Sequence, residues 1–210
     1  MTWYLVVLAA SCSYLLGNLN GAVIVSSIFS KDDVRSHGSG NAGLTNYIRS
    51  YGAKTALLGV AIDMGKAVLA CFASGMLLNA ALSYKTGVAL GGVCVILGHI
   101  FPALLGFKGG KGILSGVTVA LMMDWRIGLF VFSIFVAVYL LTHYVSLGSI
   151  LSSGSFGFIY AWVHWGEGLF PIFVGFCLSF LLVWMHHSNI VRLVKGEERK
   201  TYYFKKGKSQ

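Results

Sequence analysis

Long apolar runs separated by short polar segments dominate the sequence. The first run covers about residues 3–30 and has no charged side chain before Lys31. Further apolar runs follow at about residues 54–80, 84–105, 112–123, 126–142, 147–164 and 168–186. A helical bilayer crossing needs about 20 predominantly apolar residues. The pattern therefore predicts an all-α integral membrane protein with about seven transmembrane helices.

Two of these runs differ from a simple crossing. A cleaved signal peptide would carry a basic region and a small-residue cleavage site. Residues 3–30 show neither convincingly, so we expect a transmembrane helix there. Residues 112–123 would reach only about 18 Å, which is shorter than a hydrocarbon core of about 30 Å. This run predicts either a helix sheltered by its neighbours or a partial crossing beside a re-entrant loop.

Composition agrees with a membrane protein. Of the 210 residues, 56% are hydrophobic and only 11% are charged, and the mean hydropathy is +0.75. In soluble domains about 25% of the residues are charged. A soluble globule, a disordered chain and a nucleic-acid-binding protein are therefore excluded, despite the net charge of +9. The four cysteines lie in separate apolar runs, so they predict neither a disulfide framework nor a zinc site.

The basic residues are unevenly distributed between the polar segments. Of the 16 Lys and Arg residues, all but Lys66, Lys85 and Arg126 fall in 31–54, in 106–111 or after residue 186. The positive-inside rule places those three segments in the cytoplasm. We therefore expect an outside N-terminus and a cytoplasmic C-terminus. The chain divides into a single polytopic membrane domain over 1–190 and a basic cytoplasmic tail over 191–210, whose charge suits anionic lipid headgroups.

The first polar segment with candidate chemistry covers residues 38–46 and reads GSGNAGLTN. Its glycines allow positive φ and close approach of the backbone to a ligand. Hydroxyl and amide partners come from Ser39, Asn41 and Thr45. Asn46 and Arg49 are three residues apart and would share one face of a helix. An ordinary solvated loop leading into a helix is the alternative.

The second polar segment covers residues 98–112 and ends in Gly-Phe-Lys-Gly-Gly-Lys-Gly. Backbone N–H groups of Gly109, Gly110 and Gly112 would be free to form an anion-binding nest at the start of the next helix. Lys111 adds a positive charge suited to phosphate. The segment is not a Walker A loop, because residue 105 is Leu and Gly112 follows the lysine. A flexible glycine-rich turn is the alternative.

The third polar segment follows the last apolar run. His186 and Asn189 follow helical spacing and would project from one stripe at the membrane surface. A histidine there can donate to an oxyanion or transfer protons. His186 and His187 point apart on a helix, so a metal site is not predicted. An ordinary interfacial histidine is the alternative.

Asp63 and Lys66 are one helical turn apart inside the second apolar run. Ionisable side chains at membrane depth are costly and usually pair with one another or face a wet cavity. We therefore expect a structural ion pair, with a substrate contact as the alternative.

Together the three segments resemble the bacterial acyl-phosphate:glycerol-3-phosphate acyltransferases, the PlsY family. The similarity runs nearly end to end, and its most specific parts are Gly-Ser-Gly-Asn-x-Gly-x-Thr-Asn at 38–46 and Gly-His through Phe-x-Gly-Gly-Lys-Gly at 98–112. It also includes Tyr14–Gly17, Asp63 with Lys66, Tyr144–Leu147, His186, Asn189 and Glu197.

The resemblance implies a small enzyme of seven helices in the bacterial inner membrane, with its active site facing the cytoplasm. It would transfer a fatty acyl group from acyl phosphate to glycerol 3-phosphate, giving lysophosphatidic acid and phosphate, an early step of phospholipid biosynthesis. The partners would be these two substrates and the lipid bilayer, with no nucleic acid. Nothing in the sequence demands more than a monomer.

The resemblance also assigns roles to individual residues. The implied catalytic residues are Ser39, Arg49, His186 and Asn189. The implied substrate-binding residues are Asn41, Thr45, Asn46, Gly109, Gly110, Lys111, Gly112 and Glu197. No metal ion or other cofactor is expected. The proton acceptor would be either His186 or a substrate phosphate.

A small phosphate or organophosphate transporter is the second interpretation of the same loops. A transporter of this kind would place its anion site near the middle of the bilayer. The polar segments are all predicted on the cytoplasmic side, so the enzyme is the favoured interpretation.

Overall fold

The computed structural model describes residues 2–202, and every regular element within that range is a helix. The elements are α1 (Thr2–Gly17), α2 (Gly21–Ser30), α3 (Leu44–Tyr51), α4 (Ala56–Leu78), α5 (Tyr84–Ile100), α6 (Ile113–Met123), α7 (Trp125–Thr142), α8 (Val145–Val163), α9 (Leu169–Trp184) and α10 (His187–Val194). Short 3-10 helices cover Val34–Ser36, Ala103–Leu105 and Trp165–Glu167.

Several helices are long and apolar enough to cross a bilayer. Four such stretches are Thr2–Ser30, Ala56–Leu78, Tyr84–Leu105 and Trp125–Thr142 within the described range. A fifth results if Ile172–Trp184 and His187–Val194, which are bent by 56°, count as one span. The all-helical membrane architecture is thus confirmed, whereas seven crossings and the orientation of the termini stay predictions.

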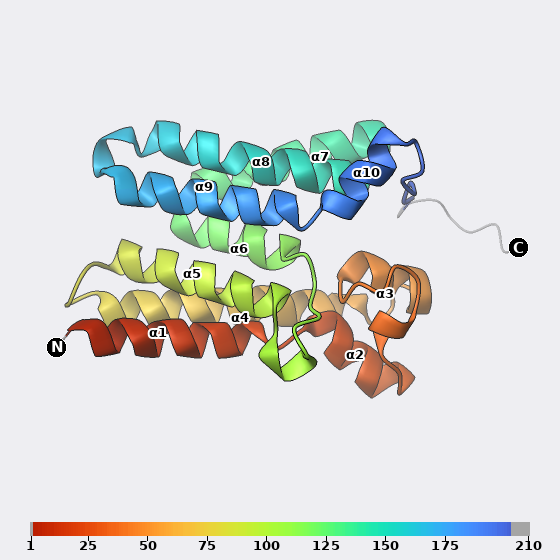
Figure 1. Cartoon of the computed structure of the whole chain (residues 1–210), viewed down its shortest axis with the longest axis horizontal. Helices are drawn as coiled ribbons and strands as arrows, with labels where there is room; N and C mark the ends of the chain where they lie inside the picture. Colours follow the sequence, from red (N-terminus) through yellow and green to blue (C-terminus); the bar gives the residue numbers. More distant parts are fainter. Residues whose placement is uncertain (1, 203–210) are drawn as a thin grey trace, which may run out of the picture.

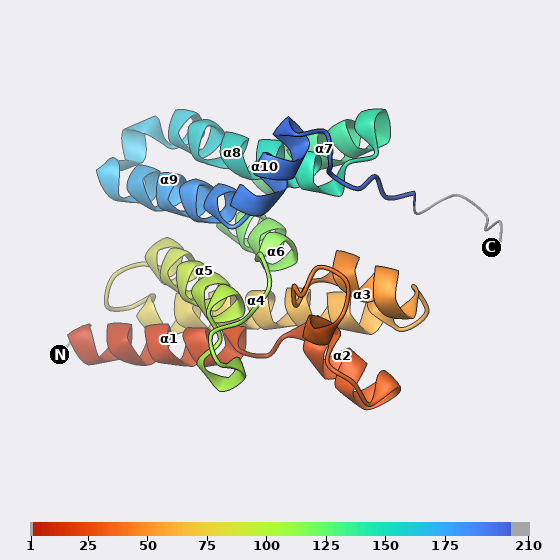
Figure 2. The ribbon, with the colours of Figure 1, turned by 45° about the vertical axis from the view of Figure 1, so that its right-hand side comes forward.

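The helices form two groups joined by α6. In both views α1, α4 and α5 lie together on one side and α7, α8 and α9 on the other, with α6 between them (Figures 1 and 2). As its short apolar run predicted, α6 has only 11 residues, and it packs against helices of both groups. The short helices α2, α3 and α10 gather at one end of the bundle. We call this the polar end, because the three polar segments meet there.

The single helix expected over residues 3–30 is broken into α1 and α2. The Nζ of Lys66 donates to the carbonyl oxygens of Gly17 and Leu19. The side-chain oxygen of Asn20 then accepts from the N–H of Val23 and caps α2. Apolar residues continue across the break, so hydropathy alone could not reveal it.

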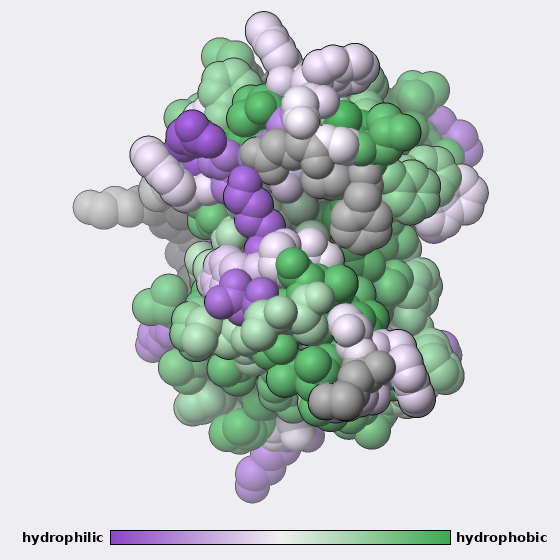
Figure 3. Space-filling view, turned by 90° about the vertical axis from the view of Figure 1, so that its left-hand side faces the viewer, coloured by the Kyte–Doolittle hydropathy of each residue, from purple (hydrophilic) through white to green (hydrophobic). Residues whose placement is uncertain are grey.

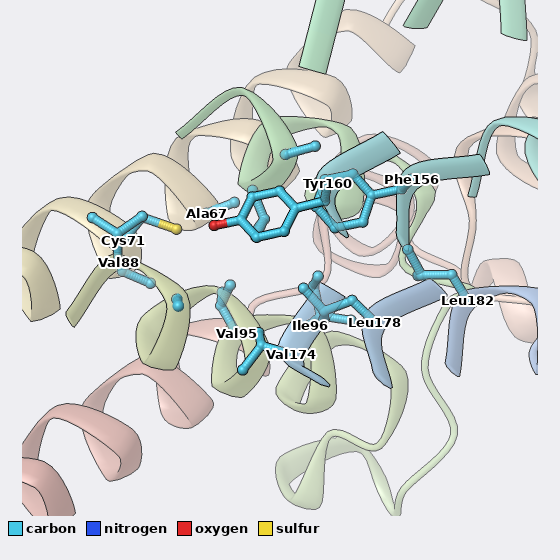
Figure 4. Packing of buried hydrophobic residues seen from close by; sticks show 14 of the residues in the cluster. Ala67, Cys71, Val88, Val95, Ile96, Phe156, Tyr160, Val174, Leu178 and Leu182 are labelled. Atoms are coloured by element: carbon cyan, nitrogen blue, oxygen red, sulfur yellow. The ribbon is translucent and has the colours of Figure 1, made fainter. Parts of the chain in front are cut away.

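Apolar side chains from both groups fill the space around α6. Tyr160 of α8 reaches toward Cys71 of α4, while Ile96 of α5 lies beside Leu178 of α9 (Figure 4). The helices α1 and α5 approach until their backbones touch, since a Cβ on Gly98 would collide with the carbonyl oxygen of Tyr14. Small residues at such crossings allow close packing of membrane helices.

The opposite end of the bundle, where α1 starts, carries exposed aromatic side chains. Trp3, Trp125, Trp162 and Trp165 are all exposed and lie at the first turn of α1, the first turn of α7 and the end of α8. Hydrophobic residues cover much of this end of the molecule (Figure 3). Tryptophan is enriched where a membrane protein meets the headgroup region. This end therefore has the composition of a membrane interface.

Candidate active site

A cavity of about 830 Å³ opens at the polar end of the bundle. All three polar segments contribute to its wall, although they are far apart in the sequence. Of the residues that the sequence singled out, the following line it: Ser39, Asn41, Thr45, Asn46, Arg49, Lys111, Gly112, His186 and Asn189. Gly109, Gly110 and Glu197 do not belong to the cavity wall.

The loop over residues 38–46 is held in place by the side chain of Asn46. Its Nδ2 donates to the carbonyl oxygens of Val34, His37 and Asn41, at 3.0, 3.0 and 3.1 Å. Its Oδ1 accepts from the N–H of Ser39 at 2.9 Å. The amide of Asn46 is therefore used within the protein, and its role is to shape the wall. The hydroxyl of Ser39, by contrast, makes no hydrogen bond to any of residues 2–202 and lies on an exposed side chain.

In the glycine-rich segment before α6, one of the three N–H groups expected to form an anion-binding nest is used within the protein. The N–H of Gly110 donates to the carbonyl oxygen of His99 at 3.1 Å, so the expectation that it is free for an anion is wrong. A Cβ on Gly109 would collide with the carbonyl oxygen of His99, and one on Gly110 with its Nε2. These two glycines therefore serve close packing, and Lys111 and Gly112 are the residues of this segment that face the cavity.

The third segment starts where α9 ends and the chain bends into α10. His186 lies in this bend and is 3% exposed. Its Nδ1 lies 2.8 Å from the carbonyl oxygen of Leu182. A carbonyl oxygen only accepts hydrogen bonds, so Nδ1 carries the proton and the neutral ring keeps an acceptor lone pair on Nε2. Asn189 lies one turn further on, is 6% exposed, and accepts a hydrogen bond from Lys111 Nζ through its Oδ1.

Glu198 organises this part of the site, and the sequence interpretation missed it. Its Oε1 accepts from Ser146 Oγ at 2.9 Å and from Asn189 Nδ2 at 2.8 Å, and its Oε2 accepts from Arg192 Nε at 2.7 Å. Glu197, which was expected to bind substrate, is exposed and lies outside the cavity wall. The two acidic residues are adjacent in an irregular segment after Gly196 (φ 72°), so no helical spacing distinguished them.

A hydrogen-bonded chain thus runs from Lys111 through Asn189 to Glu198. Because Glu198 takes the amide N–H of Asn189, the amide oxygen faces Lys111. Burial raises the pKa of Glu198, but the hydrogen bonds from Asn189, Arg192 and Ser146 outweigh it and lower the pKa. The carboxylate therefore stays charged at neutral pH and fixes the orientation of Asn189.

Residues 198–202, which we call the C-terminal strap, connect the two helix groups beside the cavity. Arg49 Nη2 in α3 donates to Thr201 Oγ1 at 2.6 Å. The N–H of Thr201 donates to the carbonyl oxygen of His143 at 2.9 Å, and Tyr139 Oη donates to the carbonyl oxygen of Thr201 at 3.1 Å. Part of the tail that was expected over 191–210 is therefore packed against the bundle; residues 203–210 lie outside the described range.

Beneath the cavity lies the ion pair that the sequence predicted. Lys66 Nζ is 2.8 Å from Asp63 Oδ1, and the two side chains are 1% and 4% exposed. The N–H of Gly21 also donates to Asp63 Oδ1, at 3.1 Å. His99 joins the pair and, with Asp63, contributes to the cavity wall. The sequence signal for His99 was its place in the Gly-His pair of the second segment.

The charge balance of the cavity wall favours an anion. Arg49, Lys111, Arg192 and Arg199 line it. Of the two acidic side chains in the wall, Asp63 is paired with Lys66 and Glu198 with Arg192, so Arg49, Lys111 and Arg199 supply the excess positive charge. Burial lowers the pKa of Lys111 to about 8, and the positive charge of Arg192 adds to the shift. Within residues 2–202 there is no group of three His, Cys, Asp or Glu side chains placed to hold a metal ion. The cationic side chains of the wall, together with its neutral donors, suit an anionic ligand.

Comparison with known proteins gives a consistent result. The family described as glycerol-3-phosphate acyltransferase matches residues 7–196. A glycerol-3-phosphate acyltransferase of Thermoanaerobacter pseudethanolicus is 40% identical over 194 residues, covering 92% of this chain and 94% of the relative. One from Finegoldia magna is 38% identical over 200 residues, covering 94% and 96%.

Solved structures show the same similarity in three dimensions. The chain superposes on the crystal structure of PlsY, an integral membrane glycerol 3-phosphate acyltransferase, in its glycerol 3-phosphate form with a TM-score of 0.80. The sequence identity is 30%, and 96% of each chain is covered. The lysophosphatidic acid form gives a TM-score of 0.78 at 28% identity, covering 96% of this chain and 95% of that one.

Proposed function

The chain belongs to the glycerol-3-phosphate acyltransferase family, and on that premise we propose that it acylates glycerol 3-phosphate with acyl phosphate as the donor. The observation that carries this proposal is the convergence of Arg49, Lys111, His186 and Asn189 on one anion-suited cavity at an end of an apolar helical bundle. Both substrates carry a phosphate, and one also carries a long alkyl chain. A cavity that is cationic at its mouth and bounded by apolar helices suits this combination.

The proposed step forms one bond and breaks one bond. The hydroxyl oxygen of glycerol 3-phosphate attacks the acyl carbonyl carbon, forming the ester C–O bond. The C–O bond between the acyl carbon and phosphate breaks, and phosphate leaves with the electron pair. The hydroxyl proton ends on the released phosphate as HPO₄²⁻. Because phosphate is a good leaving group, the protein needs mainly to position the substrates and to stabilise the developing oxyanion.

Each cavity residue then has a defined role. Arg49 and Lys111 hold the phosphate groups, since cationic donors favour phosphate oxygens. The Nε2 lone pair of His186 accepts the hydrogen bond of the attacking hydroxyl and orients it. Asn189, fixed by Glu198, sets the position of Lys111, and the Ser39 hydroxyl is a donor for the reacting carbonyl oxygen. Of the other proposed substrate contacts, Asn41 and Thr45 supply polar groups to the same wall.

We also propose how the protein sits in the membrane. The polar end faces the cytoplasm of a bacterial cell, and the tryptophan-rich end lies at the outer face of the inner membrane. This places the N-terminus outside and the C-terminus inside, with α1 and α4–α9 as seven crossings. The distribution of Lys and Arg residues supports this orientation through the positive-inside rule. The proposed unit is a monomer, since the three polar segments of a single chain are enough to form the cavity wall.

The transporter interpretation is not favoured. The curated relatives and the structural neighbours are acyltransferases. The polar cavity also lies at one end of the bundle, beside the short helices α3 and α10, whereas a transporter site is expected near the middle of the bilayer.

A direct assay tests the proposal. The purified protein in detergent is supplied with palmitoyl phosphate and glycerol 3-phosphate, and both phosphate release and lysophosphatidic acid are measured. We expect equal amounts of the two products. Palmitoyl thioester in place of palmitoyl phosphate is the control for the donor: product from the thioester alone would contradict the proposed donor. No product from either donor, with folded protein, would contradict the proposed function.

A further inference from the structure

His99 is a buried side chain at the cavity that the mechanism above does not use. It lies in the last turn of α5, is 4% exposed, and contributes to the cavity wall. Its carbonyl oxygen accepts from the N–H of Gly110. The residue therefore contacts both the cavity and the segment that carries Lys111.

Lys66 determines which nitrogen of the His99 ring carries the proton. Lys66 Nζ lies 2.8 Å from His99 Nδ1, and Asp63 Oδ1 lies 3.4 Å from the same nitrogen. An ammonium group donates and cannot accept, so in the shorter contact Nδ1 accepts from one of the N–H groups that Lys66 shares among its four neighbours. The ion pair with Asp63 at 2.8 Å keeps Lys66 charged and in place. The imidazole of His99 therefore carries a proton on Nε2.

The Nε2–H group has no protein partner within residues 2–202, although Nδ1 on the same ring is bonded. It lies beside the glycine-rich segment, because a Cβ on Gly110 would collide with Nε2. Because His99 lines the cavity, its Nε2 is open to a molecule bound there. Gly110 directly precedes Lys111, so an anionic oxygen bound in this part of the cavity could accept from Nε2.

We propose that His99 is a further substrate-binding residue, whose Nε2–H donates to a phosphoryl oxygen of the ligand held beside Lys111. The inference rests on the proposed function, because that function supplies the phosphoryl group. The group is either that of glycerol 3-phosphate or that of acyl phosphate, and these share the same acceptor chemistry. Asp63 and Lys66 act as positioning residues, since they fix the tautomer of His99 without contacting the ligand.

Two variants separate the donor from its surroundings. His99→Asn places an amide oxygen near the Nδ1 position, where it can accept from Lys66, but leaves nothing at the Nε2 position. His99→Gln is the matched control, because its longer side chain carries an N–H donor to the Nε2 position. A hydrogen bond to a charged group changes affinity by about 10- to 100-fold.

Steady-state kinetics of both variants test the proposal. For His99→Asn we expect an increase of about 10- to 100-fold in the KM of one phosphate substrate, with kcat changed less. For His99→Gln we expect a KM within about threefold of the wild type. The substrate whose KM rises identifies the phosphoryl group. Equal effects of both variants, or a lower melting temperature with unchanged KM values, would show that His99 only packs against the glycine-rich segment.

Binding of inorganic phosphate tests the inference without turnover. In wild-type protein labelled with ¹⁵N-histidine, the Nε2 resonance of His99, identified by its loss in His99→Gln, should shift on addition of phosphate. An unshifted Nε2 resonance while phosphate binds, as measured by calorimetry, would overturn the proposal. A wild type that binds phosphate through His99 but makes no lysophosphatidic acid would refute the proposed function and leave this inference standing.

Discussion

A buried lysine, Lys66, and a partly buried one, Lys111, differ in how many of their N–H donors the protein uses. Lys66 contacts Asp63, His99 and the carbonyl oxygens of Gly17 and Leu19, and its side chain is 1% exposed. Lys111 has one hydrogen-bond partner among residues 2–202, the amide oxygen of Asn189, and lines the cavity. The first lysine is fully satisfied by the protein, whereas the second keeps N–H groups for a ligand.

This difference teaches how to assign roles to buried charges. A buried ion pair whose remaining donors are also bonded contributes to a defined geometry, and removing one partner leaves an uncompensated charge. A partly buried lysine with spare donors and a lowered pKa is instead typical of a functional site. The two sites should therefore respond differently to the same substitution, one through stability and the other through activity.

The largest effect is expected for Lys66→Met. The change leaves Asp63 buried without its ammonium partner and frees the carbonyl oxygens at the break between α1 and α2. We expect a loss of about 3–5 kcal/mol in the free energy of unfolding, measured as a lower melting temperature in detergent. The double variant Asp63→Asn/Lys66→Met should recover part of this loss. A double variant less stable than Lys66→Met would contradict the role of an uncompensated charge.

The matching substitution at the open site, Lys111→Met, should affect activity instead. Loss of a charged donor to the substrate should lower kcat/KM by about 100- to 1,000-fold. The melting temperature should stay within a few degrees of the wild type, because only the bond to Asn189 is lost from the protein. A drop in melting temperature as large as that of Lys66→Met would remove the distinction between the two lysines.

Adjacent acidic residues offer a matched pair of variants. Glu198→Gln removes the charge that fixes Asn189 and Arg192, so we expect kcat/KM to fall about tenfold. Glu197→Gln alters an exposed side chain outside the cavity and should leave kcat/KM within about twofold of the wild type. A larger fall in kcat/KM for Glu197→Gln than for Glu198→Gln would show that Glu197 is the functional residue.

The sequence predicted the helices well and their breaks poorly. The apolar runs at 54–80 and 126–142 correspond to α4 (Ala56–Leu78) and α7 (Trp125–Thr142). The breaks at 18–20 and 185–186 were missed because they lie within or next to apolar residues. The first depends on a bond from Lys66, which is distant in the sequence. Hydropathy measures how readily a side chain enters lipid. It cannot reveal a helix break that depends on hydrogen bonds from residues distant in the sequence.

The sequence predicted which residues line the candidate site better than it predicted which of their atoms are free to bind a ligand. Most of the residues singled out do line one cavity, because small, polar and cationic residues are rare in an apolar chain. Asn46 and Gly110 turned out to use their polar groups inside the protein, and Glu198 takes the place expected of Glu197. Sequence spacing identifies which segments meet, but which atom of a segment remains free depends on its neighbours in space.

The pKa of Lys111 predicts a pH dependence that Lys66 should not share. Burial lowers this pKa to about 8, so the ammonium form that binds phosphate is lost as pH rises through that value. We expect kcat/KM to fall about tenfold per pH unit well above pH 8. The phosphate of glycerol 3-phosphate has its second pKa near 6 and so does not titrate in this range. Lys111→Arg should move the fall to higher pH, and a flat profile to pH 9.5 in the wild type would contradict the assignment.

The smallest effect concerns the C-terminal strap, which holds Arg49, the second side chain that we propose to bind phosphate. Thr201→Val removes only the hydroxyl that accepts from Arg49, since the backbone of Thr201 keeps its bonds to His143 and Tyr139. We expect kcat/KM to fall about two- to fivefold, because Arg49 must then be ordered when the substrate binds. Thr201→Ser keeps the hydroxyl and is the control. An increase in kcat/KM for Thr201→Val would contradict this expectation. It would mean that the bond to Thr201 holds Arg49 away from the substrate phosphate and so opposes substrate binding.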